Sequence, residues 1–512
     1  MKCLNSLICR RFTCFVFIIS IGLILLNTPL GAADDIPLKN QDNIHADDES
    51  IMKNQTKSVE KDLDDFFEDD PGPDSLDKNA GDLDEFFSDG EIQIDSIPDS
   101  QTALIDKNYS LNGNINIKTG YRLNHDSPLP GFTDHRGLFD LKGEIDIEFG
   151  YKIFSSYDFF VSGSAFYNLA YELNNRNHYT NKFLDDNEKD LELDKLFIRG
   201  SLTNAFDIKL GRQVVVWGKS DNIRVTDILN PLDLREPGMT DIEDLRLPVF
   251  MTRLDYYFFN LSLSGFLIHE HRSHKMPVFG SSYFYLPNSL PEDTDPSDRI
   301  ENTEFALSLS ATYPGFDISF YMADIYDNSA YLNAKNQRVH GKISMAGVAA
   351  NKAFGNFLYK AEAALFKGIR LSALQKNFIF VENLHDYSRF DFLVGVEYSG
   401  LKDTRLSFEA ADKWLIDYDD DAQKGGNREH MVQYALRVSR TFLNEVMEFS
   451  ILASLYGKTA DDGGFLRTQG VYDMSDDISF TLGVIFYKSG SNAMLWQIGE
   501  NDSIFSSIVY SF

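Results

Sequence analysis

The residues best suited to chemistry lie in one stretch after residue 210, where charged side chains are mixed with apolar ones. The candidate residues are Arg212, Trp217, Lys219, Asp221, Arg224, Asn230, Asp233 and Arg235. If the stretch lines a pore, its opposed charges would set a field across a constriction and filter solutes by charge. Ile223, Val225 and Leu229 make it too apolar for a free loop, so we expect it to fold inward as a pore constriction. The alternative is a solvated surface loop whose Asn-Pro and Pro-Gly steps are turns.

Other reactive groups are sparse. His269-Glu270-His271, with His274 beyond, places two imidazoles on one face of a strand end, a pattern that can hold a metal. No second cluster accompanies them, so an incidental grouping is the preferred interpretation, and we expect no metal and no cofactor. The sequence has no Gly-x-Ser-x-Gly element, and we expect no enzyme. All three cysteines lie within the first 14 residues, which excludes a disulfide framework and cysteine catalysis from the rest of the chain.

Alternation of apolar and polar residues begins near residue 110 and predicts strands with two unlike faces. From Phe139 to Ile153 the odd positions are mainly apolar, whereas the even positions include Asp140, Lys142, Glu144, Asp146 and Glu148. We expect these five side chains to face a water-filled lumen and the apolar face to contact lipid. A soluble β-sandwich would show the same alternation.

The connections between strands separate these two alternatives. Eighteen candidate strands begin near residues 111, 139, 159, 191, 206, 250, 260, 304, 316, 340, 357, 389, 404, 431, 447, 465, 478 and 503. Joins after even-numbered strands are short, and joins after odd-numbered strands are mostly long, as at residues 218–248. Short turns on one rim and long loops on the other are typical of bacterial outer-membrane barrels. We therefore predict an all-β, transmembrane antiparallel β-barrel of about 18 strands over residues 105–512, with about 16 as the alternative.

Both ends of the chain indicate export. Residues 1–33 combine a basic start, an apolar run from Phe12 to Leu26 and small residues up to Ala33, as in a Sec signal peptide; the alternative is an uncleaved anchor. At the other end Ile508, Tyr510 and Phe512 share one face of the last strand. This resembles the C-terminal assembly signal read by the barrel-insertion machinery. We expect the protein in the bacterial outer membrane, with the membrane lipids and that machinery as partners.

Residues 34–104 form a strongly acidic segment. Residues 34–100 hold 22 acidic residues against five lysines, a net charge of −17. Such a composition cannot bury enough apolar surface to fold, so we predict a disordered periplasmic segment. An eight-residue motif occurs twice in it, with paired aromatic residues Phe66, Phe67, Phe86 and Phe87. The motif predicts docking of a periplasmic or inner-membrane exporter partner; the alternative is a spacer with a duplicated stretch.

Short elements around residue 220 resemble a known family. Gly211-Arg212-Gln213, Trp217-Gly218 and Asn230-Pro231-Leu232-Asp233 occur in that order, as in an uncharacterised family of proteobacterial outer-membrane porin-like β-barrel proteins. The residue after Trp-Gly is often acidic in that family, whereas it is the basic Lys219 here. The resemblance implies a porin-like envelope protein, in some members associated with resistance-nodulation-division exporters, and no established substrate.

The net charge of −30, from 48 basic and 78 acidic residues, disfavours nucleic acid as a partner. The leading hypothesis is an outer-membrane channel that passes small polar or amphiphilic solutes. The alternative is an outer-membrane anchor or export-system component that binds a periplasmic partner through its Phe-Phe motifs.

Overall fold

The computed structural model describes residues 108–512 except for gaps at 128–132, 155, 285, 287, 298–299, 373, 377–378, 382–384, 492–494 and 497. The expected signal peptide and the expected disordered acidic segment lie outside the described residues. In the described part of the chain, strands dominate and no helix is long and apolar enough to cross a membrane.

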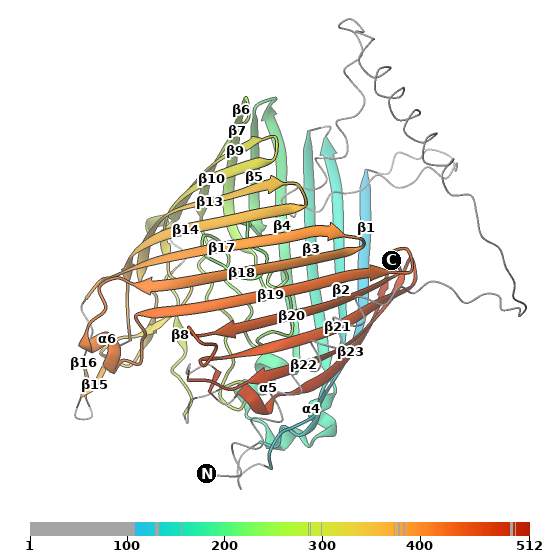
Figure 1. Cartoon of the computed structure of the whole chain (residues 1–512), viewed down its shortest axis with the longest axis vertical. Helices are drawn as coiled ribbons and strands as arrows, with labels where there is room; N and C mark the ends of the chain where they lie inside the picture. Colours follow the sequence, from blue (N-terminus) through green and yellow to red (C-terminus); the bar gives the residue numbers. More distant parts are fainter. Residues whose placement is uncertain are drawn as a thin grey trace, which may run out of the picture. The chain divides into compact units, whose positions relative to one another are not determined.

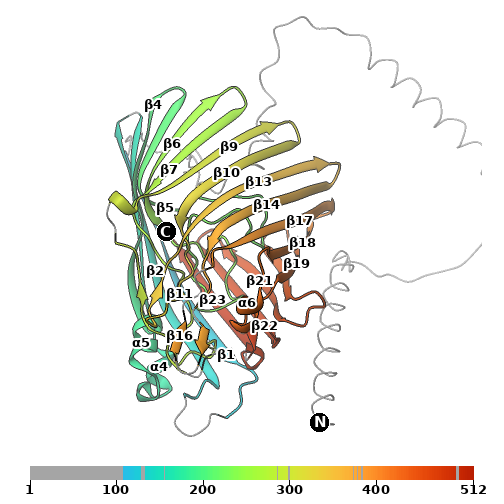
Figure 2. The same ribbon diagram turned by 90° about the vertical axis from the view of Figure 1, so that its left-hand side faces the viewer.

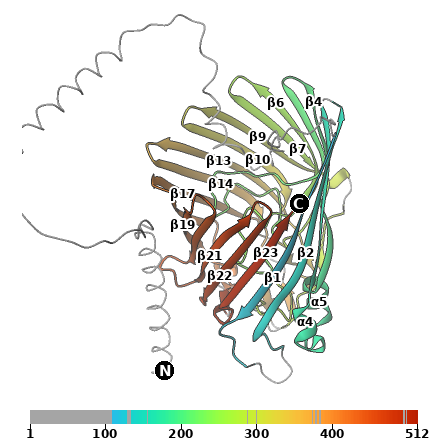
Figure 3. The same ribbon diagram turned by 90° about the vertical axis from the view of Figure 1, so that its right-hand side faces the viewer.

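Eighteen antiparallel strands form one closed sheet (Figure 1). Their bounds are β1 Tyr109–Arg122, β2 Gly137–Phe154, β3 Tyr157–Asn168, β4 Lys189–Thr203, β5 Phe206–Gln213, β6 Val249–Phe258, β7 Leu261–Ile268, β9 Glu304–Tyr313, β10 Phe316–Tyr326, β13 Lys342–Phe354, β14 Phe357–Ile369, β17 Tyr387–Leu401, β18 Thr404–Leu415, β19 His430–Phe442, β20 Met447–Tyr456, β21 Gly463–Ser475, β22 Ile478–Lys488 and β23 Ser503–Ser511. Each strand pairs with the next of these along the chain, and β23 pairs with β1, as Figure 3 shows. This pairing closes the sheet into a barrel and leaves it without an edge.

The predicted strand count is confirmed, and every strand begins within two residues of its expected start. The expected asymmetry of the connections is confirmed as well. Turns such as those between β9 and β10 and between β13 and β14 are short, and β1 starts and β23 ends at the same rim. The long connections lie at the opposite rim (Figure 2). We call these two ends of the barrel the turn rim and the loop rim.

The long connections carry the smaller elements. The helices are α4 (Ala170–Leu173), η2 (Arg176–His178), α5 (Asn181–Asn187), η3 (Ile300–Asn302), α6 (Asp420–Lys424) and η5 (Ile498–Glu500). The strands are β8 (Asp293–Thr294), β11 (Tyr331–Leu332) and β12 (Arg338–Val339), which form one small sheet, and β15 (Leu374–Lys376) and β16 (Ile379–Val381), which form another.

The two faces of each strand differ in the way that the alternation predicts. On β1 and β2 the exposed large apolar residues include Leu111, Ile115, Ile117, Ile145 and Ile147. Similar outward residues recur around the barrel, among them Leu210, Phe250, Leu307, Phe320, Val394, Leu482 and Ile508. An outer surface of this kind matches a hydrocarbon environment, whereas the opposite face carries the charged residues. The chain is therefore a transmembrane β-barrel.

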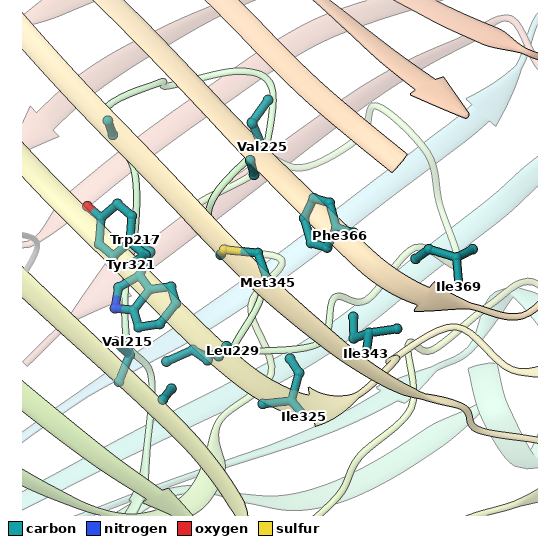
Figure 4. Close-up of a cluster of buried hydrophobic side chains, with 14 of the residues drawn as sticks. Val215, Trp217, Val225, Leu229, Tyr321, Ile325, Ile343, Met345, Phe366 and Ile369 are labelled. Carbon is teal, nitrogen blue, oxygen red and sulfur yellow. The ribbon is translucent and has the colours of Figure 1, made fainter. Parts of the chain in front are cut away.

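The largest buried apolar cluster lies inside this barrel. It joins Val215, Trp217, Val225 and Leu229 of the β5–β6 connection to inward residues of several strands, among them Tyr321, Met345 and Phe366 (Figure 4). Phe266 and Ala364 belong to the same cluster. A core between a loop and the inner wall has a simple physical origin. The sequence supplies apolar residues on the inner face of these strands, and only a loop inside the barrel can cover them.

Candidate functional site

The β5–β6 connection, residues 214–248, enters the barrel and is fastened at its base by Asn230. The side-chain oxygen of Asn230 accepts the N–H of Val215 at 2.8 Å. Its amide nitrogen donates to the carbonyl oxygens of Gln213 at 3.2 Å and Leu247 at 2.9 Å. One fully buried side chain thus joins both arms of the connection. We call residues 214–248 the inner loop.

Aromatic packing holds the first arm of the inner loop against the wall. The Trp217 ring stacks on Tyr321 of β10, with centroids 4.7 Å apart, and meets Phe266 of β7 edge-on at 5.8 Å. Gly218 follows with a positive φ of 91°, and a Cβ atom there would lie 2.7 Å from Oε1 of Glu362. The Trp-Gly element therefore combines an aromatic anchor with a residue that lets the backbone approach a carboxylate.

That carboxylate, Glu362 on β14, is the main polar anchor. Its Oε1 accepts the backbone N–H groups of Lys219 at 2.6 Å and Ser220 at 2.9 Å. Its Oε2 accepts the N–H of Thr226 at 3.2 Å and the Thr226 hydroxyl at 2.8 Å. Two separate parts of the inner loop are thus held on one buried side chain. Charge-assisted hydrogen bonds of this type are stronger than neutral ones.

The tip of the inner loop reaches further around the wall. Glu409 on β18 accepts the N–H groups of Asp221 at 2.8 Å and Asn222 at 3.0 Å. The Asp221 carboxylate in turn pairs with Lys360 of β14 at 2.6 Å. The loop therefore reaches from β5 and β6 to β18, more than a third of the way around the barrel.

The second arm of the inner loop crosses to another part of the wall. Asp241 pairs with Arg437 of β19 at 2.9 Å and also with Arg467 of β21. The carbonyl oxygen of Gly238 accepts from Arg467 at 3.1 Å, and that of Pro237 accepts from Tyr487 of β22 at 2.7 Å. Anchors on both arms cross the lumen, so they narrow its free section.

Five charged residues of the inner loop neutralise one another in two groups. Asp227 binds Arg224 at 3.1 Å and Arg246 at 2.8 Å, and all three side chains are largely buried. Burial lowers the pKa of Arg224, and the Asp227 carboxylate opposes that effect. Asp233 and Arg235 pair within the loop, with Nε and Oδ1 2.9 Å apart. Arg224 is therefore largely buried in an ion pair within the inner loop.

Arg212 differs from the expectation. It lies on β5 two residues after Leu210, whose side chain is exposed on the outer face. Its guanidinium pairs with Glu270 of the β7–β9 connection and donates to the carbonyl oxygen of Leu193 at 2.9 Å. The next residue, Gln213, is the one that turns inward and bonds to the carbonyl oxygen of Met251 at 3.1 Å. Because side chains alternate between the two faces of a strand, Arg212 shares the outer face with Leu210 and does not point toward the inner loop.

The five charged residues of β2 lie opposite the outward apolar ones, on the inner face. Asp140 accepts from Asn168 of β3 at 2.8 Å, and Lys142 lies 5.0 Å from the ring centroid of Phe166. Glu144 pairs with Lys118 of β1 at 2.6 Å. Asp146 and Glu148 continue the row toward the turn rim, without an ion pair in the described part of the chain.

The acidic part of the inner loop contains two carboxylates, Glu243 and Asp244, whose pKa is raised. Burial raises the pKa of Asp244, neighbouring Asp241 raises it further, and the Lys118 ammonium on β1 opposes both. Burial likewise raises the pKa of Glu243, with Asp244 adding to the effect. Lys118, which pairs with Glu144 of β2, therefore also acts on Asp244 of the inner loop.

Sequence reasoning missed the wall residues that hold the inner loop, which are Glu362, Glu409, Lys360, Arg437 and Arg467. All five occupy inward positions of predicted strands, so the alternation could have placed them on the lumen face. It could not have paired them with the loop. Of the other predicted residues, Phe66, Phe67, Phe86 and Phe87 lie outside the described residues. The residues Ile508 and Tyr510 lie exposed on the outer face of β23, and Phe512, which follows the end of that strand, is exposed as well.

Comparison with known proteins gives one family and a group of solved barrels. The family model described as "Protein of unknown function (DUF1302)" matches residues 99–512. No curated protein matches the chain. Similar solved structures include OccK9 (OpdG) of Pseudomonas aeruginosa, at 12% identity, 79% coverage of this chain, 97% of that chain and a TM-score of 0.46. They also include OccAB2 of Acinetobacter baumannii, at 8% identity, 79% and 98% coverage and a TM-score of 0.46.

Proposed function

The chain belongs to the family of proteins of unknown function DUF1302, and we propose that it is an outer-membrane channel that passes small polar or amphiphilic solutes without changing them chemically. The observation that carries the proposal is the inner loop. A barrel that served only as an anchor would gain nothing from a charged lumen spanned by a loop fixed to several strands. A channel uses such a loop to set the width and the field of its narrowest section.

The charge of the lumen supports a preference for cations. Several carboxylates are neutralised by basic partners, as Glu144 is by Lys118 and Asp241 is by two arginines. Asp146 and Glu148 are not paired in this way within the described residues, and the acidic residues Glu243 and Asp244 lie in the inner loop. These four carboxylates leave the lumen with an excess of negative charge. Such an excess raises the local concentration of cations and repels anions.

Conductance across a planar lipid bilayer tests the proposal. The folded full-length barrel should give discrete current steps, and a salt gradient should give a reversal potential that indicates cation preference. Asp146→Asn with Glu148→Gln should reduce that preference. The control, Asp420→Asn with Asp421→Asn, removes the same two charges from α6 in a loop-rim connection and should leave the reversal potential nearly unchanged. A folded, inserted barrel without current steps would refute the channel function.

A further inference from the structure

Three residues from two different connections meet at the loop rim. His271 and Asp295 belong to the β7–β9 connection, and His340 belongs to the β10–β13 connection. Their ligand atoms all lie within 4.8 Å of one another. The small sheet of β8, β11 and β12 joins the same two connections, and Arg338 of β12 binds Asp293 of β8 at 2.8 Å. The cluster therefore sits on a braced framework and not on two independent loops.

His340 offers one nitrogen to the cluster in a defined protonation state. Its Nδ1 lies 2.7 Å from the carbonyl oxygen of Asp327, which can only accept, so Nδ1 carries the proton. The lone pair is then on Nε2, which lies 3.4 Å from Oδ1 of Asp295 and 3.0 Å from the Ser273 hydroxyl. The side chain is fully buried at 0% exposure. A backbone bond on one imidazole nitrogen is the usual way in which proteins orient the other toward a metal.

His271 presents its nitrogen in the same manner. Its Nδ1 lies 3.4 Å from Oε1 of Glu304, so a proton on Nδ1 would face that carboxylate and leave the lone pair on Nε2. Its Nε2 lies 3.9 Å from Oδ1 of Asp295 and has no hydrogen-bond partner among the described residues, although the side chain is only 4% exposed. A buried nitrogen left in this state is costly. A cation bound at Nε2 would remove that cost.

The neighbouring histidines do not share this arrangement. Nε2 of His269 lies 2.9 Å from the Thr252 hydroxyl, and Nδ1 of His274 accepts the N–H of Leu232 at 2.8 Å. The sequence places His269 and His271 together, whereas the structure pairs His271 with the distant His340, their ring centroids 4.5 Å apart. The second histidine of the cluster therefore comes from the β10–β13 connection and not from the neighbouring residues of the sequence.

We propose that His271, His340 and Asp295 form a binding site for a divalent transition metal, with Zn²⁺ as the preferred ion. Zinc binds imidazole nitrogen and carboxylate oxygen at about 2.0–2.2 Å, so tetrahedral ligand atoms lie roughly 3.3–3.5 Å apart. The separation of 3.4 Å between His340 and Asp295 fits that value. The 3.9 Å from His271 requires a small movement of Asp295, whose side chain is 49% exposed. Water or the Ser273 hydroxyl would complete the fourth position.

Bound zinc would join the β7–β9 connection to the β10–β13 connection at the loop rim. This role does not depend on transport, because it concerns the loops outside the strands. Mg²⁺ and Ca²⁺ should bind poorly, since they prefer oxygen ligands.

The test is titration of the tag-free, folded barrel with Co²⁺ and then Zn²⁺ after removal of metal by a chelator. Co²⁺ should give the visible absorption of a tetrahedral site, and Zn²⁺ should displace it with a stoichiometry of one. His271→Gln, His340→Gln and Asp295→Asn should each weaken binding by about 100-fold or more. Each change removes a direct ligand, and replacing a residue that only hydrogen-bonds to a ligand already weakens metal binding by about 10- to 100-fold. The matched control His269→Asn should bind as the parent does.

Limited proteolysis supplies a second readout. Zn²⁺ should slow cleavage of the β7–β9 connection in the parent and in His269→Asn, but not in Asp295→Asn. Asp295 is half exposed and outside every barrel strand, so its replacement leaves the barrel able to fold, which heat modifiability on a gel can verify. Metal binding that is equal in the parent and in all three ligand variants would overturn the proposal, as would failure of the parent to bind Co²⁺ or Zn²⁺. Neither outcome would affect the conductance result, so the two proposals can fail separately.

Discussion

The hydroxyl of Thr226 in the inner loop donates to Glu362 of β14 at 2.8 Å, although the two residues are 136 positions apart in the chain. The same carboxylate also holds Lys219 and Ser220 by their backbone N–H groups. One wall residue therefore fixes the loop at two points, and it does so with acceptors only. Any change that removes an acceptor leaves a buried N–H group without a partner.

We predict that Glu362→Gln releases the inner loop from the wall while the barrel still forms. The amide NH₂ group of glutamine cannot accept the N–H groups that one carboxylate oxygen now receives, which should cost about 3 kcal/mol or more of local stability. Single-channel conductance should rise or become noisy, and trypsin should cut at Lys219. Glu148→Gln makes the same change on β2, away from these bonds, and should not expose Lys219. Parental conductance and protection in Glu362→Gln would show that the carboxylate is not the anchor.

The second prediction concerns the two faces of β2. Ile147, with 45% of its surface exposed on the outer face, should tolerate charge poorly, whereas Asp146 faces the lumen. Ile147→Arg should destabilise the barrel by about 2–4 kcal/mol near the bilayer midplane, while Asp146→Asn should leave folding nearly unchanged. The fraction of heat-modifiable folded protein measures the difference. Equal loss in both variants would contradict the assigned faces.

The third prediction is a pH dependence at the base of the inner loop. Burial lowers the pKa of His274 to about 3, and the nearby Arg224 guanidinium adds to the effect. The ordinary value is 6.5. His274 of the β7–β9 connection therefore takes up a proton more readily when it has separated from the inner loop than when it is packed against Leu232. The stabilisation that neutral, packed His274 gives to the base of the inner loop is therefore complete above about pH 6.5, and it is lost progressively as the pH falls toward 3. Protonation on Nδ1 would also break the bond from Leu232.

Hydrogen exchange of the Leu232 amide at pH 7.5 and pH 5 measures this effect, with chelator present to remove any contribution of metal. After correction for intrinsic exchange rates, protection in the parent should be lower at pH 5. His274→Asn keeps an acceptor for the Leu232 N–H group but cannot titrate, so its protection should change much less. Equal pH dependence in both proteins would assign the effect to another group.

The fourth prediction concerns the acidic segment. Replacing Phe66, Phe67, Phe86 and Phe87 with serine should leave barrel insertion intact, since these residues lie outside the strands, and should abolish crosslinking to a periplasmic partner. Each motif offers only two aromatic side chains, so one copy should bind weakly, and two copies should bind much better if the partner has two sites. Replacing one pair at a time tests this. Recovery of the same partners after all four replacements would reduce the segment to a spacer.

The sequence was sufficient to predict the barrel because the relevant signal is local. Whether Ile147 faces lipid and Asp146 faces water depends only on the period of two along a strand, and the loop asymmetry is visible in the spacing of the strands. Such regularities predicted all 18 barrel strands. The same rule places Glu362 and Glu409 on the inner face, since their neighbours alternate with exposed apolar residues.

The contacts within the barrel were decided by tertiary structure. Nothing local in the sequence links Glu362 to Thr226, or Asp241 to Arg437 and Arg467, because these pairs meet only when the sheet has closed and the inner loop has folded across it. His271 shows the limit most clearly: its neighbour His269 turns to Thr252, and the imidazole that it faces is His340, 69 residues later. The period of two in the sequence determines which face of the strand a side chain occupies. Closure of the barrel determines which residues that side chain contacts.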